Sequence, residues 1–300
     1  MDKARQGEWL AGAALVAACL FWAGNFVTGR AIRGQIDPET LNLLRWLVAA
    51  VAFLPLTGRA LWAHGGALWR HRLWIGFLGL TGVVGFQEAT YRALTLAPVA
   101  SAALLLSVTP LLILLASAAL GQGRLGARQT GAVALSLLGV AVLLGDGDPA
   151  VALRLELGAG ELWQLAAVAS WTAYTLALRA RPPEISPELA LMGAILAALP
   201  VLAALALWQG HTRIAALPLS AWAAVGYVGI FASLAAFSAW GYGVQRKGPA
   251  AAGLYINLIP VLAALLAWLV LGEAVTFGQV AGAAVILAAL VLGGSPRRRA

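Results

Sequence analysis

The residues best suited to binding a small molecule are aromatic and neutral polar groups inside long apolar runs of the sequence. Their hydroxyl and amide groups can hydrogen-bond an ammonium or a carboxylate, and their rings suit apolar side chains and cations. The sequence predicts that they line a cavity without imposing one net charge; for the deep tryptophans, plain helix packing is the alternative. The predicted binding residues are Trp22, Asn25, Tyr91, Ser107, Trp171, Tyr174, Trp240, Tyr255 and Asn257.

Glu88 and Arg45 are ionisable residues that fall deep inside apolar runs. A charged side chain at the centre of a bilayer costs about 2.5–3.5 kcal/mol when it has no partner. Counted along two neighbouring helices at about 1.5 Å per residue, the two side chains lie at similar depths. Two interpretations follow: a structural ion pair between Glu88 and Arg45, or a proton-coupling role for Glu88.

Pro110 and Pro260 fall in the middle of apolar runs. A proline inside a helix removes a hydrogen-bond donor and frees the carbonyl four residues earlier. The sequence predicts a bend at each proline, with the freed carbonyl facing a cavity beside Ser107 and Asn257. A kink that only improves helix packing is the alternative.

The sequence carries no motif for metal binding or catalysis. It has no HExxH and no Asp-rich or His-rich cluster, and its single cysteine, Cys19, excludes a disulfide framework. We therefore expect no metal, no cofactor and no enzymatic activity. An intramembrane lipid-modifying enzyme is a weaker alternative, because metal-assisted transfer would need such a cluster.

The composition indicates an integral membrane protein. Hydrophobic residues make up 61% of the 300 residues and charged residues 11%, against about a quarter charged in soluble domains. Apolar runs of about 20 residues predict membrane-spanning helices, and the absence of short alternating segments excludes a β-barrel. We predict an all-α fold with ten transmembrane helices, at about 9–29, 39–57, 73–95, 97–120, 127–145, 158–179, 187–208, 218–244, 249–271 and 275–293.

The second half of the chain repeats the first at an offset of 149 to 151 residues. The most specific matches pair Tyr91 with Tyr242, Pro110 with Pro260, and Gly131 with Gly282; Pro38-Glu39 likewise matches Pro187-Glu188. The repeats are 9–145 and 158–293, with five predicted helices each. Because five is odd, the two halves must enter the membrane from opposite sides, which predicts an inverted five-plus-five repeat.

The basic residues predict the orientation of these helices. The net charge of +8 comes from Lys and Arg between and after the apolar runs, which indicates membrane orientation rather than nucleic-acid binding. With the N-terminus inside, fourteen basic residues lie on the cytoplasmic side and five outside. We therefore expect both termini in the cytoplasm.

Three segments resemble a known transporter family: WAGNFVTGR from Trp22 to Arg30, ALTLAPVASAALLLSVTPLL through Pro110, and LIPVLAALLAWLVLGEAVTFGQVAGAAVIL from Leu258 to Leu287. They look like the two tandem domains of the EamA-type branch of the drug/metabolite transporter superfamily, and within it most like the YddG-type amino-acid exporters. The resemblance covers nearly the whole chain. It implies ten helices, an inverted repeat, a bacterial inner-membrane location and export of small metabolites.

The leading interpretation is a secondary transporter that exports small metabolites, above all neutral and aromatic amino acids, by alternating access around a central cavity. Its partners would be the small-molecule substrate and the lipid bilayer, with no nucleic acid; a monomer is compatible with the sequence. The alternative is an exporter of lipophilic or quaternary cations, for which Glu88 and the tryptophans would supply charge and cation–π contacts.

Overall fold

The computed structural model describes residues 3–32, 34–96, 99–122, 126–150, 158–272 and 274–294. In this part of the chain every regular element is a helix. The longer α-helices are α1 (Lys3–Ala31), α2 (Pro38–Ala63), α5 (Phe86–Leu96), α7 (Thr109–Ala119), α8 (Ala127–Leu144), α9 (Ala159–Arg179), α10 (Pro187–Gln209), α12 (Ala236–Lys247), α14 (Leu258–Leu271) and α15 (Phe277–Gly294).

Shorter helices lie between these longer helices along the chain. They are α3 (Gly65–Arg70), α4 (Arg72–Leu78), α6 (Val99–Leu106), α11 (Leu219–Tyr227), α13 (Pro249–Gly253), the π-helices η1 (Gly79–Gly85) and η4 (Val228–Ala235), and the 3₁₀-helices η3 (Ile214–Ala216) and η5 (Leu254–Asn257). Three predicted helices are each made of several consecutive elements: α4–η1–α5, α11–η4–α12 and α13–η5–α14. The predicted helix at 97–120 is divided into α6 and α7, and the predicted helix at 39–57 continues to Ala63.

Seven of the described helices are long and apolar enough to cross a membrane. They are Gln6–Gly29, Pro38–Ala63, Ala102–Ala119, Ala127–Leu144, Pro187–Gln209, Leu219–Lys247 and Pro249–Val270. The helices predicted at 73–95 and 158–179 are present but contain more polar residues, among them Glu88, Arg92 and Gln164. The apolar helix Phe277–Gly293 is shorter than the others. The chain is therefore a multi-pass, all-helical membrane protein.

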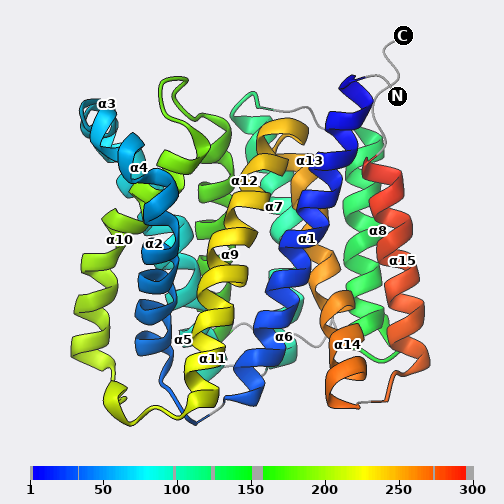
Figure 1. Ribbon diagram of the computed structural model, residues 1–300. Coiled ribbons are helices and arrows are strands. Elements are labelled where there is room, and N and C mark those ends of the chain that lie inside the picture. Colours follow the sequence, from blue (N-terminus) through cyan, green and yellow to red (C-terminus); the bar gives the residue numbers. More distant parts are fainter. Residues whose placement is uncertain are drawn as a thin grey trace.

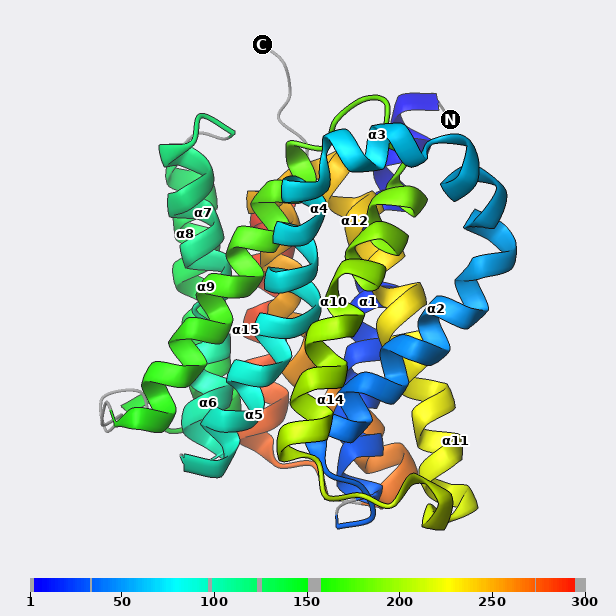
Figure 2. The same cartoon turned by 90° about the vertical axis from the view of Figure 1, so that its left-hand side faces the viewer.

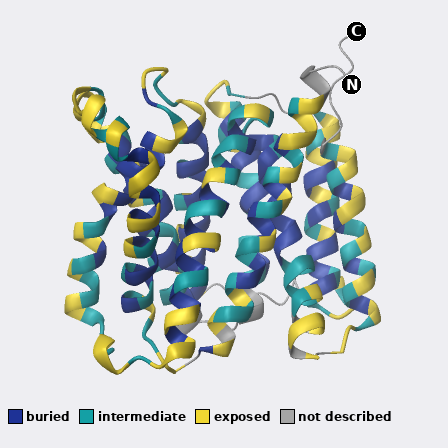
Figure 3. Cartoon of the chain, viewed as in Figure 1, coloured by how far each residue is buried: buried dark blue, intermediate teal, exposed yellow. Residues whose placement is uncertain are grey.

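The helices stand side by side and run roughly lengthwise through the molecule (Figures 1 and 2). The start of α1 and the end of α15 lie at the same end of the bundle (Figure 1); we call this the terminal end and the other the far end. Buried residues concentrate on the inner helices, and exposed ones mark the ends and the periphery (Figure 3). Large exposed side chains on the periphery include Leu56, Trp62, Trp208 and Val291, which suits a surface covered by lipid.

The two halves of the chain interleave rather than fold separately. Helix α1 packs on α12, α9 on α5, α2 on α10, and α8 on α15. Some of these contacts are too close for side chains: a Cβ on Gly79 would lie 2.6 Å from the carbonyl oxygen of Ala194, and one on Gly229 would lie 2.8 Å from that of Arg45. Glycine is thus required where η1 meets α10 and where η4 meets α2, as small residues are where membrane helices approach closely.

Candidate functional site

An aromatic cluster fills the centre of the bundle. Trp22 of α1 lies 5.1 Å from Trp171 of α9 and 5.5 Å from Trp240 of α12, measured between ring centroids. Tyr174 lies 5.2 Å from Trp171 and 5.6 Å from Phe237. Most of these pairs meet edge-on or tilted, the arrangement that aromatic quadrupoles favour. The structure therefore brings together four of the predicted binding residues: Trp22, Trp171, Tyr174 and Trp240.

Three further rings belong to this aromatic cluster and were not predicted as binding residues. Phe237 lies 4.9 Å from Trp46, and Phe86 lies 5.2 Å from Trp171. An apolar ring within an apolar run carries no distinguishing signal, so the sequence did not single out Trp46 or the two phenylalanines as binding residues. The repeat points to them only indirectly, since Phe86 and Phe237 are matched at an offset of 151.

The cluster is packed, not hollow. Trp240 is 0% exposed and Tyr174 2%, and two of the indole nitrogens are used internally: Trp22 Nε1 donates to the carbonyl of Ala232 at 3.0 Å, and Trp240 Nε1 to Thr175 Oγ1 at 3.3 Å. In this structure the middle of the bundle is thus closed by aromatic side chains.

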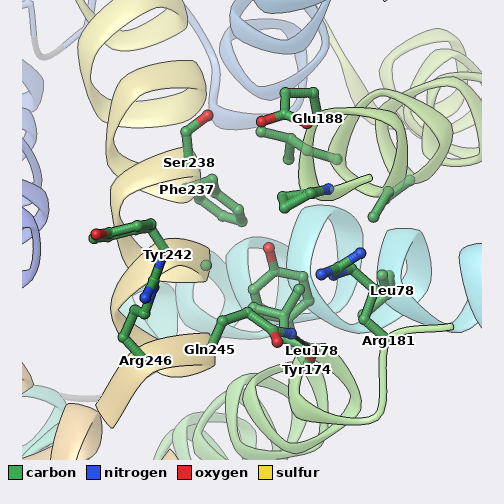
Figure 4. Close-up of a pocket in the computed structure, with 15 residues that line it drawn as sticks. Leu78, Tyr174, Leu178, Arg181, Glu188, Phe237, Ser238, Tyr242, Gln245 and Arg246 are labelled. Carbon is green, nitrogen blue, oxygen red and sulfur yellow. Dashed lines mark hydrogen bonds between the residues drawn. The ribbon is translucent and has the colours of Figure 1, made fainter. Parts of the chain in front are cut away.

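A pocket of about 350 Å³ lies directly beside the cluster, toward the terminal end. Tyr174 and Phe237 form its buried floor, whereas Glu188 and Arg246 are exposed at the helix ends. Figure 4 shows these side chains gathered around one space, between α9, the start of α10 and the end of α12. The lining residues are Leu78, Tyr174, Leu178, Arg181, Pro187, Glu188, Ala190, Leu191, Ala194, Phe237, Ser238, Gly241, Tyr242, Gln245 and Arg246.

The rim of the pocket carries both signs of charge. Arg181 donates to the carbonyl of Ile185, and the Arg246 guanidinium lies 5.4 Å from the ring of Tyr242. Glu188 supplies a carboxylate on the α10 side. Gln245 donates to the carbonyl of Leu178 and so ties α12 to α9. The pocket therefore offers a carboxylate, two guanidinium groups and an aromatic floor.

Of the nine predicted binding residues, only Tyr174 lines this pocket. The other lining residues came mostly from α10 and α12, where Ala194 and Gly241 carry no chemical signature. Ser238 is a polar residue inside an apolar run, and Tyr242 is the residue that matches Tyr91 in the repeat. A polar side chain within an otherwise apolar helix was the sequence signal that could have pointed to these two lining residues.

Tyr255 and Asn257 direct their polar atoms away from the aromatic cluster. The Asn257 Nδ2 donates to Ser136 Oγ of α8 at 2.8 Å. The Tyr255 hydroxyl lies beside Gly12, where an added Cβ would be 3.3 Å away. Both residues are buried, so in this structure they join helices rather than line the pocket.

The helices are interrupted ahead of both prolines at which the sequence predicted a bend. Helix α6 ends at Leu106 and α7 begins at Thr109, directly before Pro110; the 3₁₀-helix η5 ends at Asn257, three residues before Pro260. The carbonyl of Leu106, freed by Pro110, accepts a hydrogen bond from Thr109 Oγ1 at 2.5 Å. Ser107 Oγ donates to the carbonyl of Leu104 at 2.5 Å. The expectation of a free carbonyl at this bend was wrong, because neighbouring hydroxyls satisfy the interrupted backbone.

The expected ion pair between Arg45 and Glu88 is not formed. Glu88 Oε1 lies 3.3 Å from Arg92 Nε, one turn further along α5, where opposite charges four residues apart are natural neighbours. Arg45 is fully buried, and its Nε donates to Ser233 Oγ of η4 at 2.7 Å. Tyr91 is the predicted binding residue that faces this guanidinium.

Two polar ties join loops at opposite ends of the bundle. At the far end, the carboxylate of Asp37 accepts hydrogen bonds from the backbone of Thr212 at 2.8 Å and His211 at 3.2 Å. Burial opposes its ionisation, but the bonds from Thr212 and Thr40 outweigh it and lower the pKa of Asp37 to about 2. At the terminal end, His71 Nε2 lies 2.7 Å from Glu184 Oε1, and this bond lowers the pKa of Glu184.

Among the described residues no three His, Cys, Asp or Glu side chains are placed to hold a metal ion. Asn25 lies half-buried near the far end of α1, outside both the pocket and the ring contacts described above. The site is thus an aromatic centre flanked by a charged pocket on one side and the Arg45 region on the other.

Comparison with known proteins identifies the family. The sequence pattern of the EamA-like transporter family matches residues 9–145 and 158–293. The chain is similar to the aromatic amino acid exporter YddG of Ancylobacter novellus, at 33% identity over 93% of each chain. It is also similar to a probable terminal-alkyne amino-acid exporter of Streptantibioticus cattleyicolor, at 28% identity over 93% of this chain and 91% of that one.

A solved crystal structure has the same fold, with a TM-score of 0.76 and 26% identity over 94% of this chain and 95% of that one. These likenesses extend over nearly the whole length of each protein, and both repeats are included. They confirm the resemblance seen in the sequence segments. The chain belongs to the EamA-like transporter family.

Proposed function

We propose that this transporter exports amino acids, with a preference for neutral and aromatic side chains, across a bacterial inner membrane. The observation that carries the proposal is the pocket, in which an aromatic floor of Tyr174 and Phe237 lies below a rim holding Glu188, Arg181 and Arg246. Its volume of about 350 Å³ is at the small end of the range of about 300–1,000 Å³ for small-molecule sites. A zwitterion with an apolar side chain matches both parts.

The mechanism we propose is alternating access between two inverted repeats of five spans. The helix contacts support this mechanism, because they follow the repeat. The contact of α1 with α12 corresponds to the contact of α9 with α5, and α2–α10 and α8–α15 are each contacts between corresponding helices of the two repeats. The π-helices η1 and η4 also fall at matching positions. An inverted repeat of this kind places the substrate between the halves, near the middle of the membrane.

The orientation we propose has both termini in the cytoplasm. Helix ends at the terminal end carry Arg59, Arg72, Arg179, Arg246 and Lys247, the excess that cytoplasmic loops show. The pocket then opens toward the cytoplasm and would receive substrate for export, while the Asp37–Thr212 tie closes the outer end. We expect broad substrate specificity, because apolar contacts distinguish two substrates that differ by one methylene by only about 1–3 kcal/mol.

Purified protein in liposomes tests the proposal. We expect uptake of labelled phenylalanine, tryptophan and leucine in exchange for internal amino acid, and a loss of most of it in Tyr174→Ala. Trp62→Ala is the matched control, because Trp62 is 92% exposed on the periphery. Accumulation of a quaternary ammonium dye without any amino-acid movement would instead support cation efflux, which the two guanidinium groups of the rim disfavour.

A further inference from the structure

The charged pocket has a counterpart in the first repeat, at the far end of the bundle. Glu188, Leu191 and Ala194 of α10 match Glu39, Asn42 and Arg45 of α2 at an offset of 149. Gly241 and Tyr242 of α12 match Thr90 and Tyr91 of α5 at an offset of 151. The positions that line the pocket on one side of the aromatic cluster are therefore occupied by a different set of residues on the other side.

This counterpart region is buried, and several of its polar atoms lack hydrogen-bond partners among the described residues. Asn42 is 1% exposed and Arg45 0%. Neither Nδ2 nor Oδ1 of Asn42 makes a hydrogen bond to a described residue, nor does Nη1 of Arg45 or Oγ1 of Thr90. Asn42 and Arg45 stand one turn apart on one face of α2, and Tyr91, next to Thr90, faces the Arg45 guanidinium.

Unpaired buried polar groups are rare in proteins and call for a physical reason. The Arg45 guanidinium calls for a reason most strongly, because a buried charge normally needs an opposite charge close by to stabilise it. Among the described residues the partners of Arg45 are neutral: Ser233 Oγ, the carbonyl of Ala232 at 3.4 Å, and the side chain of Tyr91. The nearby carboxylate of Glu88 is engaged by Arg92. Arg45 therefore retains the capacity to bind an anion.

We propose that Asn42, Arg45, Thr90 and Tyr91 form an outer vestibule, closed in this structure, in which Arg45 binds the carboxylate of the substrate. The inference rests on the proposed function, since the vestibule opens in the other state of an alternating-access cycle. Guanidinium matches a carboxylate in shape and charge, and Asn42 and Thr90 supply further polar groups. Substrates would be monocarboxylates with an apolar or aromatic side chain.

The inner pocket and the outer vestibule differ in their polar residues, and this difference makes the proposal specific. The inner pocket has Leu191, Ala194 and Gly241 where the outer vestibule has Asn42, Arg45 and Thr90. Its guanidinium groups lie at the exposed rim, whereas Arg45 lies deep beside the aromatic cluster, 5.7 Å from the ring of Trp46. Recognition of the carboxylate is thus concentrated on the outer side.

A binding experiment tests the anion site without requiring transport. Thermal stabilisation of the purified protein is measured with 3-phenylpropanoate and with the uncharged 3-phenylpropanamide. We expect the carboxylate to bind the wild type about ten- to hundredfold more tightly than the amide. Arg45→Met should remove this preference and Arg45→Lys should restore part of it. An unchanged carboxylate preference in Arg45→Met would overturn the site.

A labelling experiment tests the vestibule with Arg45 intact. In a Cys19→Ala background, Asn42→Cys should react with an impermeant maleimide from outside the cell. The reaction should be several-fold faster with Thr212→Val, which weakens the outer tie, than with Thr40→Val, which alters the α2 cap beside it. Equal rates in the two backgrounds, or no reaction from outside, would contradict the vestibule. If liposomes moved no amino acid while both experiments succeeded, the proposed function would fail and the anion site would stand.

Discussion

The carboxylate of Asp37 receives the backbone N–H of Thr212 at 2.8 Å, while its own backbone N–H donates to Thr212 Oγ1 at 2.9 Å. The two residues are 175 positions apart and belong to loops of different repeats. The same carboxylate caps α2 by accepting the backbone N–H of Thr40 at 2.8 Å. One side chain therefore both starts a helix and holds the far end of the bundle together.

Removing this carboxylate should loosen the far end. Asp37→Ala abolishes the cap, which contributes about 0.5–2 kcal/mol, together with the tie. We expect a lower unfolding temperature in detergent and a shift toward the outward-open state. Thr212→Val should shift the state while leaving the cap in place. Equal thermal stability of Asp37→Ala and wild type would contradict the assignment.

The same interaction predicts a dependence on pH. Because the folded pKa of Asp37 is lowered from 3.8 to about 2, its contribution is complete above pH 3.8 and is lost as the pH falls toward 2. Allowing for screening by solvent, the contribution is about 1 kcal/mol. Unfolding followed between pH 5 and 2 should show this loss in the wild type, and the Asp37→Ala curve should be flatter by that amount.

The opposite tie should have the opposite effect on conformation. His71 and Glu184 join loops at the terminal end, 2.7 Å apart, and both are partly exposed. Glu184→Gln weakens the pair, so we expect the inner pocket to open more readily and Ser238→Cys to react faster with an internal maleimide. Arg72→Gln is a nearby charge control, because Arg72 donates to the carbonyl of Trp69 and packs on its ring. An unchanged or slower reaction in Glu184→Gln would show that this tie does not limit how far the pocket opens.

Which features of the structure could be predicted from the sequence depends on the physical signal that each position carries. Apolar runs predicted the helical segments, and the matched prolines predicted bends close to the places where the helices are interrupted, because both patterns act locally on the backbone. The partner of Arg45 was missed, since Ser233 lies 188 positions away and nothing local distinguishes it. The pocket was missed because Ala194 and Gly241 contribute space, and space is a property of packing.

The interruptions before the prolines should matter for movement more than for folding. Pro110→Ala and Pro260→Ala would allow the backbone hydrogen bonds that the prolines remove, straightening segments next to the centre of the bundle. We expect slower amino-acid exchange in liposomes with a folded yield close to wild type. Pro55→Ala, in the peripheral part of α2, is the control. Unchanged exchange in both variants would leave the prolines a packing role.

Surface labelling decides the topology. In a Cys19→Ala background, single cysteines at Gln122 and Gly147 flank α8 at its two ends. If α8 crosses the membrane with both termini inside, Gln122→Cys should react from the cytoplasmic face and Gly147→Cys from outside. Reaction of both with an external reagent would exclude the inverted arrangement.

The aromatic cluster should contribute to stability and transport through different residues. Trp171 contacts the rings of Trp22, Tyr174 and Trp240 and is 4% exposed, so Trp171→Ala should cost about 3–5 kcal/mol in unfolding free energy. Tyr174→Phe keeps the ring and removes only the hydroxyl at the pocket floor. It should retain the unfolding temperature while changing the ratio of tyrosine to phenylalanine transported. If Tyr174→Phe instead lowered stability as much as Trp171→Ala, the hydroxyl would serve packing, and the floor of the pocket would not be the place where the substrate side chain is distinguished.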